Sequence, residues 1–135
     1  MSLLRLSRQL GRPLRILAIE TSCDDTAVSI VDGEKRILSD QNFHQHAIHA
    51  ATQGIVPSLA ASGHRRVLPL AIDAALNQAH MSIADIDVFA TTRGPGIAGC
   101  LSVGFEAGRL LSTVCKKPLF AVHHMVQSAG ETTNC

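Results

Sequence analysis

Residues 16–31 read Ile16-Leu17-Ala18-Ile19-Glu20-Thr21-Ser22-Cys23-Asp24-Asp25-Thr26-Ala27-Val28-Ser29-Ile30-Val31. Two short apolar runs, rich in β-branched residues, flank a polar loop, which is the pattern of a β-hairpin inside a packed sheet. The loop holds the three carboxylates of Glu20, Asp24 and Asp25, which repel one another unless a cation, water or a polar ligand lies among them. Two interpretations stay open: a solvated acidic turn, or a ligand or metal-phosphate loop at the mouth of a sheet.

The pattern on either side of this hairpin predicts an α/β fold. We expect strands over 15–20, 26–31, 35–41, 87–92 and 118–122, and helices over 57–80 and 98–115. The first of these helices follows from apolar residues at helical spacing, namely Val67, Leu68, Ala71, Ile72, Ala75 and Leu76. The order βββαβαβ predicts one mixed sheet with helices on both faces.

A glycine-containing turn, Arg93-Gly94-Pro95-Gly96, follows the fourth predicted strand. Turns at strand ends are where open α/β sheets bind ligands. This turn is too short for a P-loop, and no Lys-Ser or Lys-Thr pair follows it. A tight strand-to-helix turn is therefore an equally good explanation of its glycines.

Residues 42–54 show no regular pattern and contain His44, His46 and His49. Three histidines so close together are able to bind a metal ion. No Cys or Asp lies at ligand spacing beside them, so the sequence favours a solvated loop.

The composition indicates a single globular domain. Of its 135 residues, 46% are apolar and 17% are charged, which suits one domain with a packed core. The net charge of +1 gives no global basic field for nucleic acid. With no Trp or Tyr and only four Phe, base-stacking platforms are scarce. No apolar run approaches a membrane span, so no membrane partner is expected. The four cysteines lack metal-site spacing and are interpreted as reduced thiols of an intracellular protein.

The N-terminal segment, residues 1–13, has a different character. It contains Arg5, Arg8 and Arg12 but no acidic residue, and its leucines and arginines fall on opposite faces of a helical projection. A basic, serine-containing amphipathic start is typical of a mitochondrial targeting segment. We therefore expect residues 1–13 to direct the protein to mitochondria, with an ordinary basic tail on a cytosolic domain as the alternative.

Four motifs along the chain resemble those of a known family. They are Ile19–Thr26, the segment His49…Gly54-Ile55-Val56-Pro57…His64, Gly94–Gly104, and Val122–Met125. With its order of elements, the range 14–125 resembles the first lobe of the actin, Hsp70 and sugar-kinase superfamily, which is RNase H-like. More narrowly, it resembles the tRNA threonylcarbamoyladenosine transferases, the TsaD family, and the Arg-rich start resembles the mitochondrial branch.

The resemblance implies an acyltransferase that moves threonylcarbamoyl from its adenylate to N6 of the adenosine next to the anticodon in tRNA. The implied partners are tRNA and threonylcarbamoyl-adenylate, and the implied cofactor is one divalent metal ion, iron or zinc. The residues expected to face the cleft between two lobes are Glu20, Ser22, Asp24, Asp25, Gly94 and Gly96. No catalytic side chain is assigned.

The resemblance ends after Met125. The family continues as His-Met-x-x-His, in which both histidines bind the metal; His124 matches the first, but Ser128 occupies the second position. The second lobe is also missing, so we expect a divergent tail over 126–135 and an incomplete, inactive enzyme. Two alternatives stay open: an inactive lobe that dimerises or self-associates through its helices as a binding module, and another ATP-dependent member of the superfamily, such as a sugar kinase.

Overall fold

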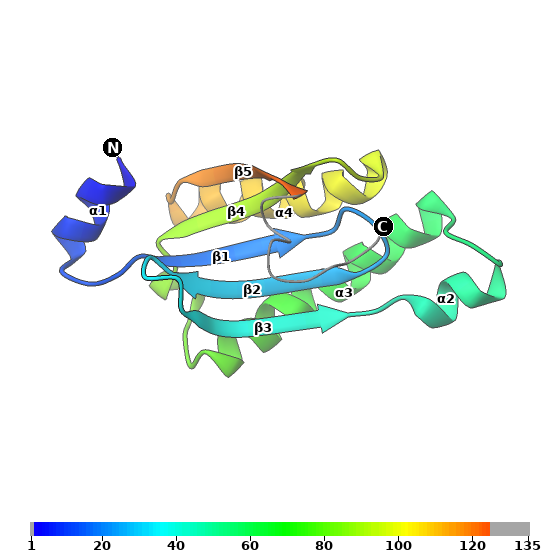
Figure 1. The fold of residues 1–135 in the computed structure, drawn as a ribbon, viewed down its shortest axis with the longest axis horizontal. Helices are drawn as coiled ribbons and strands as arrows, with labels where there is room; N and C mark the ends of the chain where they lie inside the picture. The colour runs from blue at the N-terminus through cyan, green and yellow to red at the C-terminus, as the bar shows by residue number, and fades with distance from the viewer. Residues whose placement is uncertain (1, 125–135) are drawn as a thin grey trace.

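The sheet is built around β1 (Arg15–Glu20), the first strand of the opening stretch. The computed structural model describes residues 2–124, so the expectations for Ser128 and for the 126–135 tail fall outside the described residues. β1 is the middle strand of a five-stranded sheet with the order β3-β2-β1-β4-β5 (Figure 1). The other strands are β2 (Thr26–Asp32), β3 (Ile37–Phe43), β4 (Val88–Gly94) and β5 (Leu119–His123).

The strand directions confirm the mixed sheet and the expected order of elements. β1 pairs antiparallel with β2 and parallel with β4, while β3 is antiparallel to β2 and β5 is parallel to β4. β1 and β2 pair without a shift from Arg15 opposite Asp32 to Glu20 opposite Ala27. The loop at 21–25 is therefore a hairpin loop at the edge where β1, β4 and β5 end.

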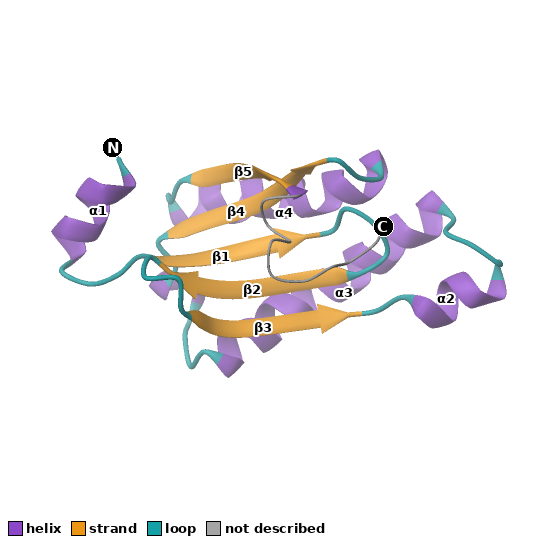
Figure 2. Cartoon of the chain, in the orientation of Figure 1, coloured by secondary structure: helices purple, strands orange, loops and turns teal. Residues whose placement is uncertain are grey.

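Two long helices, α3 (Pro57–Gln78) and α4 (Ala98–Cys115), lie on one face of the sheet (Figures 1 and 2). α3 packs on β2 and β3, α4 packs on β4 and β1, and the two helices contact each other. Within the described part of the chain this differs from the expectation of helices on both faces. The crossovers from β3 to β4 and from β4 to β5 run the same way across the sheet, and connections of the same hand place both helices on the same side.

Three short helical segments complete the described chain: α1 (Leu3–Leu10), α2 (His46–Ala51) and the 3₁₀ turn η1 (Ile83–Asp85). α2 lies in the segment expected to be irregular. Its alanines favour a helix locally, but six residues are too few to show an apolar periodicity. Between residues 2 and 124, no helix is both long and apolar enough to cross a membrane.

The core lies between the sheet and the two long helices. β1 and β2 contribute alternate side chains, which are fully buried: Leu17, Ile19, Val28 and Ile30. The facing side of α3 contributes small residues, Ala60, Ala71 and Ala75, which are also fully buried. Because these side chains are short, the helix backbone approaches the sheet closely, and groups on α3 come within reach of the loop at 21–25.

Arg12 lies inside the segment expected to be a targeting sequence, yet its side chain contacts the folded domain. The Arg12 guanidinium forms two hydrogen bonds with the Asp87 carboxylate, at 2.7 and 3.0 Å, and the Arg15 N–H donates to the same carboxylate. Burial would raise the pKa of Asp87, but the contacts from Arg12 and Arg15 outweigh it and hold that pKa below its usual value. In contrast, α1 has no buried residue.

Candidate functional site

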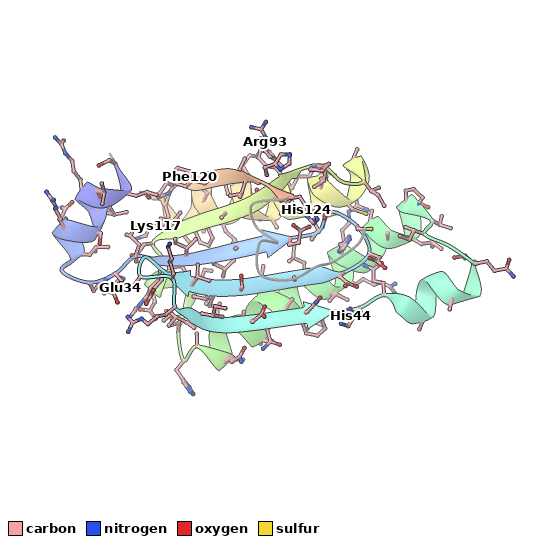
Figure 3. All side chains as sticks on the ribbon, in the orientation of Figure 1. Glu34, His44, Arg93, Lys117, Phe120 and His124 are labelled. Atoms are coloured by element: carbon pink, nitrogen blue, oxygen red, sulfur yellow. The ribbon has the colours of Figure 1, made fainter. Side chains whose placement is uncertain are left out.

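Polar side chains gather where β1, β4 and β5 end. Glu20 is the last residue of β1, Thr92 lies near the end of β4, and His124 directly follows β5. Figure 3 shows His124 at this edge of the sheet, close to the end of β1. In open α/β sheets the carboxyl ends of parallel strands are the usual place for a ligand site.

The Glu20 carboxylate is the centre of this cluster. One oxygen, Oε1, accepts the backbone N–H of Ser22 at 2.6 Å. The other, Oε2, accepts the hydroxyl of Thr92 and lies 3.1 Å from Nδ1 of His124. Three segments that are far apart in the sequence therefore converge on a single side chain.

These contacts decide the charge of Glu20. Burial by itself would raise the pKa of the carboxyl, but hydrogen bonds from Ser22, Thr92 and His124 favour the ionised form and bring the pKa below its usual value. The cluster therefore holds a carboxylate anion at neutral pH. Nδ1 of His124 carries a hydrogen when it donates to that anion.

Ser22, His124 and Glu20 are also the residue types of a hydrolase triad, but their geometry is different. Ser22 Oγ lies 3.2 Å from Nδ1 of His124, the same nitrogen that faces Glu20. A triad needs the nucleophile and the carboxylate on opposite nitrogens of the imidazole, so that a proton passes through the ring. Ser22 and Glu20 instead both face Nδ1 of His124 and hold the imidazole in place.

The loop after β1 is held by the turn after β4. The Ser22 carbonyl accepts the backbone N–H of Ile97 at 2.7 Å. A Cβ on Gly96 would lie 2.6 Å from that carbonyl oxygen, so only glycine fits this approach. Gly94 has φ +151°, a conformation that side chains disfavour. The two glycines expected at the cleft thus serve the contact between two loops.

Thr21 anchors the same loop to α4. Its buried hydroxyl donates to the Cys100 carbonyl at 2.7 Å and accepts the Gly104 N–H at 3.2 Å. A Cβ on Gly104 would lie 2.6 Å from this hydroxyl oxygen. The Gly94–Gly104 motif therefore contains a second glycine that lets α4 contact the loop.

His64 anchors the loop from α3. Its Nε2 lies 2.8 Å from the Cys23 carbonyl oxygen and its Nδ1 lies 2.7 Å from Thr26 Oγ1. Neither His64 nor Thr92 was among the predicted site residues. The only sequence signals were the place of His64 in the second motif and of Thr92 just before Gly94.

The two aspartates of the loop have different surroundings. Asp25 Oδ2 lies 2.9 Å from His44 Nδ1, and within the described chain Asp25 Oδ1 is buried without a hydrogen-bond partner. Asp24 is half-buried beside it. The structure therefore brings Glu20, Ser22, Asp24 and Asp25 into one loop, with Glu20 and Ser22 directed at His124 and Asp25 directed at His44.

The described residues do not form the metal site that the family resemblance implies. Over residues 2–124, no group of three or more His, Cys, Asp or Glu side chains is placed to hold a metal ion. His124 is the one implied ligand within that range, and its Nδ1 faces Glu20 and Ser22. Of the three clustered histidines, His44 pairs with Asp25, and the side chains of His46 and His49 are outside the description.

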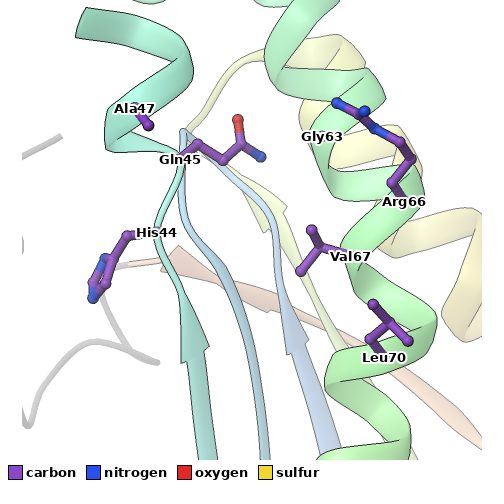
Figure 4. A pocket seen from close by; sticks show the side chains of 7 residues that line it. All are labelled: His44, Gln45, Ala47, Gly63, Arg66, Val67 and Leu70. Atoms are coloured by element: carbon purple, nitrogen blue, oxygen red, sulfur yellow. The ribbon is translucent and has the colours of Figure 1, made fainter.

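A cavity of about 270 Å³ lies to one side of this cluster (Figure 4). It is open to the surface between the end of β3 and α3. Its lining residues are His44, Gln45, Ala47, Gly63, Arg66, Val67 and Leu70. Among its lining residues, His44 contacts the acidic loop through Asp25, and none of the described lining residues belongs to the Glu20 cluster.

The mixed sheet, its helices and the polar cluster at the strand ends define a single α/β lobe. Its fold is similar to that of YeaZ from Pseudomonas aeruginosa, with a TM-score of 0.59 at 23% identity, over 82% of this chain and 43% of that chain. A second structure, of a Pseudomonas aeruginosa protein with similarity to peptidase YEAZ, matches with the same TM-score and coverage at 24% identity.

Residues 36–132 match the sequence model of TsaD, tRNA N6-adenosine threonylcarbamoyltransferase. Curated proteins of that name from Agrobacterium fabrum and Rhizobium etli are each 45% identical, over 116 and 115 residues, or 83% and 82% of this chain. The chain belongs to the tRNA N6-adenosine threonylcarbamoyltransferase family. It spans about a third of the length of these relatives, 32% in each case.

The close approach of Gly96 to Ser22 predicts a specific sensitivity. Gly96→Ala is expected to lower the free energy of unfolding by about 1–3 kcal/mol, because the new methyl group meets backbone atoms of Ser22. Gly99→Ala is the matched control, since its Cβ would come no closer than 3.9 Å to Ala61 and alanine favours the helix by up to about 1 kcal/mol. Urea denaturation measures both, and equal midpoints for the two variants would contradict the proposed contact.

Proposed function

We propose that this chain is the first lobe of an enzyme that transfers threonylcarbamoyl from its adenylate to N6 of an adenosine in tRNA. Membership of the family supports the reaction class. The arrangement that supports the location is the Glu20 cluster, which joins the ends of three strands at the edge of the sheet. By this proposal, that edge faces the acyl donor and the adenosine.

The lobe would contribute mainly orientation. Acyl transfer requires the carbonyl carbon of the donor to be held near the attacking amine, and this positioning supplies a large part of the rate enhancement. Asp24 and Asp25 follow the anchored backbone of Ser22 and Cys23. The half-buried Asp24 carboxylate is suited to accept a hydrogen bond from the N6 amine or the threonyl group, and Asp25 lies beside it, paired with His44. A metal ion, when bound, would polarise the carbonyl group, but the described residues do not form its site.

By the same proposal, the 135-residue chain alone does not catalyse transfer, since its relatives are about three times as long. We therefore expect no modified tRNA from the purified chain, but we expect transfer from a chimera in which residues 14–124 replace the matching segment of the Agrobacterium fabrum relative. In the chimera, Asp24→Asn with Asp25→Asn should reduce modification by about 10²-fold, because a reacting group displaced by about 1 Å loses that much rate.

Mass spectrometry of tRNA from Agrobacterium fabrum that carries each chimera in place of its own protein measures this effect. Asp40→Asn, an exposed carboxylate on β3, is the control and should leave modification unchanged. Equal modification with and without the two loop carboxylates would contradict their role. Transfer by the 135-residue chain itself would contradict the expected inactivity.

Exposed apolar side chains on α4 favour a second candidate function, an inactive lobe that self-associates. Leu110 and Val114 lie one turn apart and are 64% and 70% exposed, and Phe105 is also exposed. β5 is the outer strand of the described sheet, and an unpaired edge invites pairing with another chain. We propose that the lobe associates with a second copy through these surfaces.

Self-association predicts a mass above that of the monomer in size-exclusion chromatography with light scattering. Leu110→Glu with Val114→Glu should shift the protein towards the monomer, because charge on this face opposes burial. Ile37→Glu changes an equally exposed apolar side chain on the opposite edge strand, β3, and should leave the mass unchanged. A monomeric wild type with a cooperative melt above about 60 °C would show that the lobe is self-sufficient.

We further propose that α1 directs the protein to mitochondria. α1 is capped by Ser2, has Arg5 and Arg8 but no acidic residue, and buries no side chain. These are the properties that a targeting helix requires.

A fusion of residues 1–30 to a fluorescent protein is expected to enter mitochondria. Arg5→Glu with Arg8→Glu should leave the fusion in the cytosol. Arg5→Lys with Arg8→Lys preserves the charge, and this fusion should still enter mitochondria. Microscopy with a mitochondrial marker measures where each fusion is located. A wild-type fusion that stays cytosolic would contradict the proposal.

A further inference from the structure

His64 is a buried imidazole that has no part in the transfer chemistry proposed above. It lies in the first half of α3, on the side that faces the sheet, and its side chain is 0% exposed. A histidine buried this completely needs partners for both ring nitrogens. Both nitrogens have a partner: Cys23 lies in the acidic loop between β1 and β2, and Thr26 is the first residue of β2.

The partners fix the protonation of the ring. The Cys23 carbonyl oxygen can only accept a hydrogen bond, so Nε2, at 2.8 Å, carries the hydrogen. Nδ1 of the neutral ring then accepts from the Thr26 hydroxyl, at 2.7 Å. The Cys23 contact thus places the hydrogen on Nε2, and burial, which lowers the pKa of His64, favours the neutral Nε2–H tautomer.

The two partners bracket the aspartates. Cys23 immediately precedes Asp24, and Thr26 immediately follows Asp25. The carboxylates of Glu20, Asp24 and Asp25 repel one another and favour a spread loop. The imidazole bridges the two ends of the Asp24–Asp25 segment and opposes that spreading.

We propose that His64 is the positioning residue of the acidic loop: it holds Cys23 and Thr26 on either side of Asp24 and Asp25 and so fixes the backbone that carries the two carboxylates. The importance of that placement for transfer rests on the proposed function. The positioning itself does not, because it is a property of the free protein.

The positioning has a pH dependence of known sign. Burial lowers the pKa of His64 below its ordinary value of 6.5, although the Cys23 carbonyl and the charges of Asp24, Glu20 and Asp25 act in the opposite direction. Below pH 6.5 an opened loop or unfolded chain takes up a proton that the closed form does not. The closed loop is therefore fully favoured above pH 6.5 and loses stability as the pH falls from 6.5 towards the pKa of the folded state.

The experiment is NMR relaxation on the full 135-residue chain. In the wild type at pH 7.5 we expect order parameters near 0.85 for the amides of Cys23, Asp24 and Asp25, and an Nε2–H tautomer in the ¹⁵N spectrum of His64. His64→Ala should lower the loop values below about 0.6, with Leu17 and Ile19 of β1 unchanged. His64→Gln, whose side-chain amide still donates to the Cys23 carbonyl, should restore most of the order.

Two controls separate positioning from a purely structural role. His80→Asn removes an exposed histidine just after α3 and should leave the loop unchanged. The wild-type loop should also lose order as the pH falls below 6.5, whereas the His64→Gln loop should not.

An ordered loop in His64→Ala, or an Nδ1–H tautomer in the wild type, would overturn the proposal. If His64→Ala does not fold, the tautomer of His64 in the wild type and the pH response of the His64→Gln loop still test the proposal. The measurement needs no substrate, so failure of the transfer proposal leaves its outcome unaffected.

Discussion

An ionised carboxylate at the end of the central strand is the constraint on which the candidate site depends. Glu20 ends β1 half-buried, and a buried charge is tolerated only when donors surround it. Its donors come from the next loop (Ser22), from β4 (Thr92) and from the residue after β5 (His124). Because those segments meet only in the completed sheet, the carboxylate is stable only when the parallel strands are in register.

The same requirement explains the many glycines and small residues near the loop. The loop backbone has carbonyl groups that need donors, and the donors come from α3 and from the residue just before α4. Ile97 and His64 supply them to Ser22 and Cys23. Gly96 and Gly104 allow this approach, because a methyl group at either position would overlap atoms of the loop. The glycines thus allow both the close packing of the loop and the hydrogen bonds to its carbonyl groups.

The opposite end of the sheet shows the same principle. Asp87 is buried next to the start of β4, and Arg12 and the Arg15 N–H satisfy it. The contact ties the chain before β1 to the sheet and separates a folded domain from the exposed helix α1. A processing event before Arg12 would preserve this pair, whereas one after Arg12 would remove the guanidinium from a buried carboxylate.

Much of the fold was predictable from local patterns. Two short apolar runs rich in β-branched residues, around Leu17 and Val28, predicted β1 and β2, and helical periodicity predicted α3 and α4, because each pattern follows from the geometry of a single element. Motif order predicted the family. The short helix α2 was not predicted, since a six-residue element has no periodicity to detect.

What only the tertiary structure decided is which residues meet. The sequence by itself placed Glu20, Ser22, Asp24 and Asp25 in one loop, because they are neighbours in the chain. It did not indicate that Thr92 and His124 complete the Glu20 cluster, or that His64 holds the loop, because those contacts join residues 38 to 104 positions apart. It also predicted helices on both faces, whereas α3 and α4 share one face, because the side on which each helix lies depends on the strand order and on the hand of the crossovers. Contacts of this range are set by the packing of the whole sheet, and no local pattern encodes them.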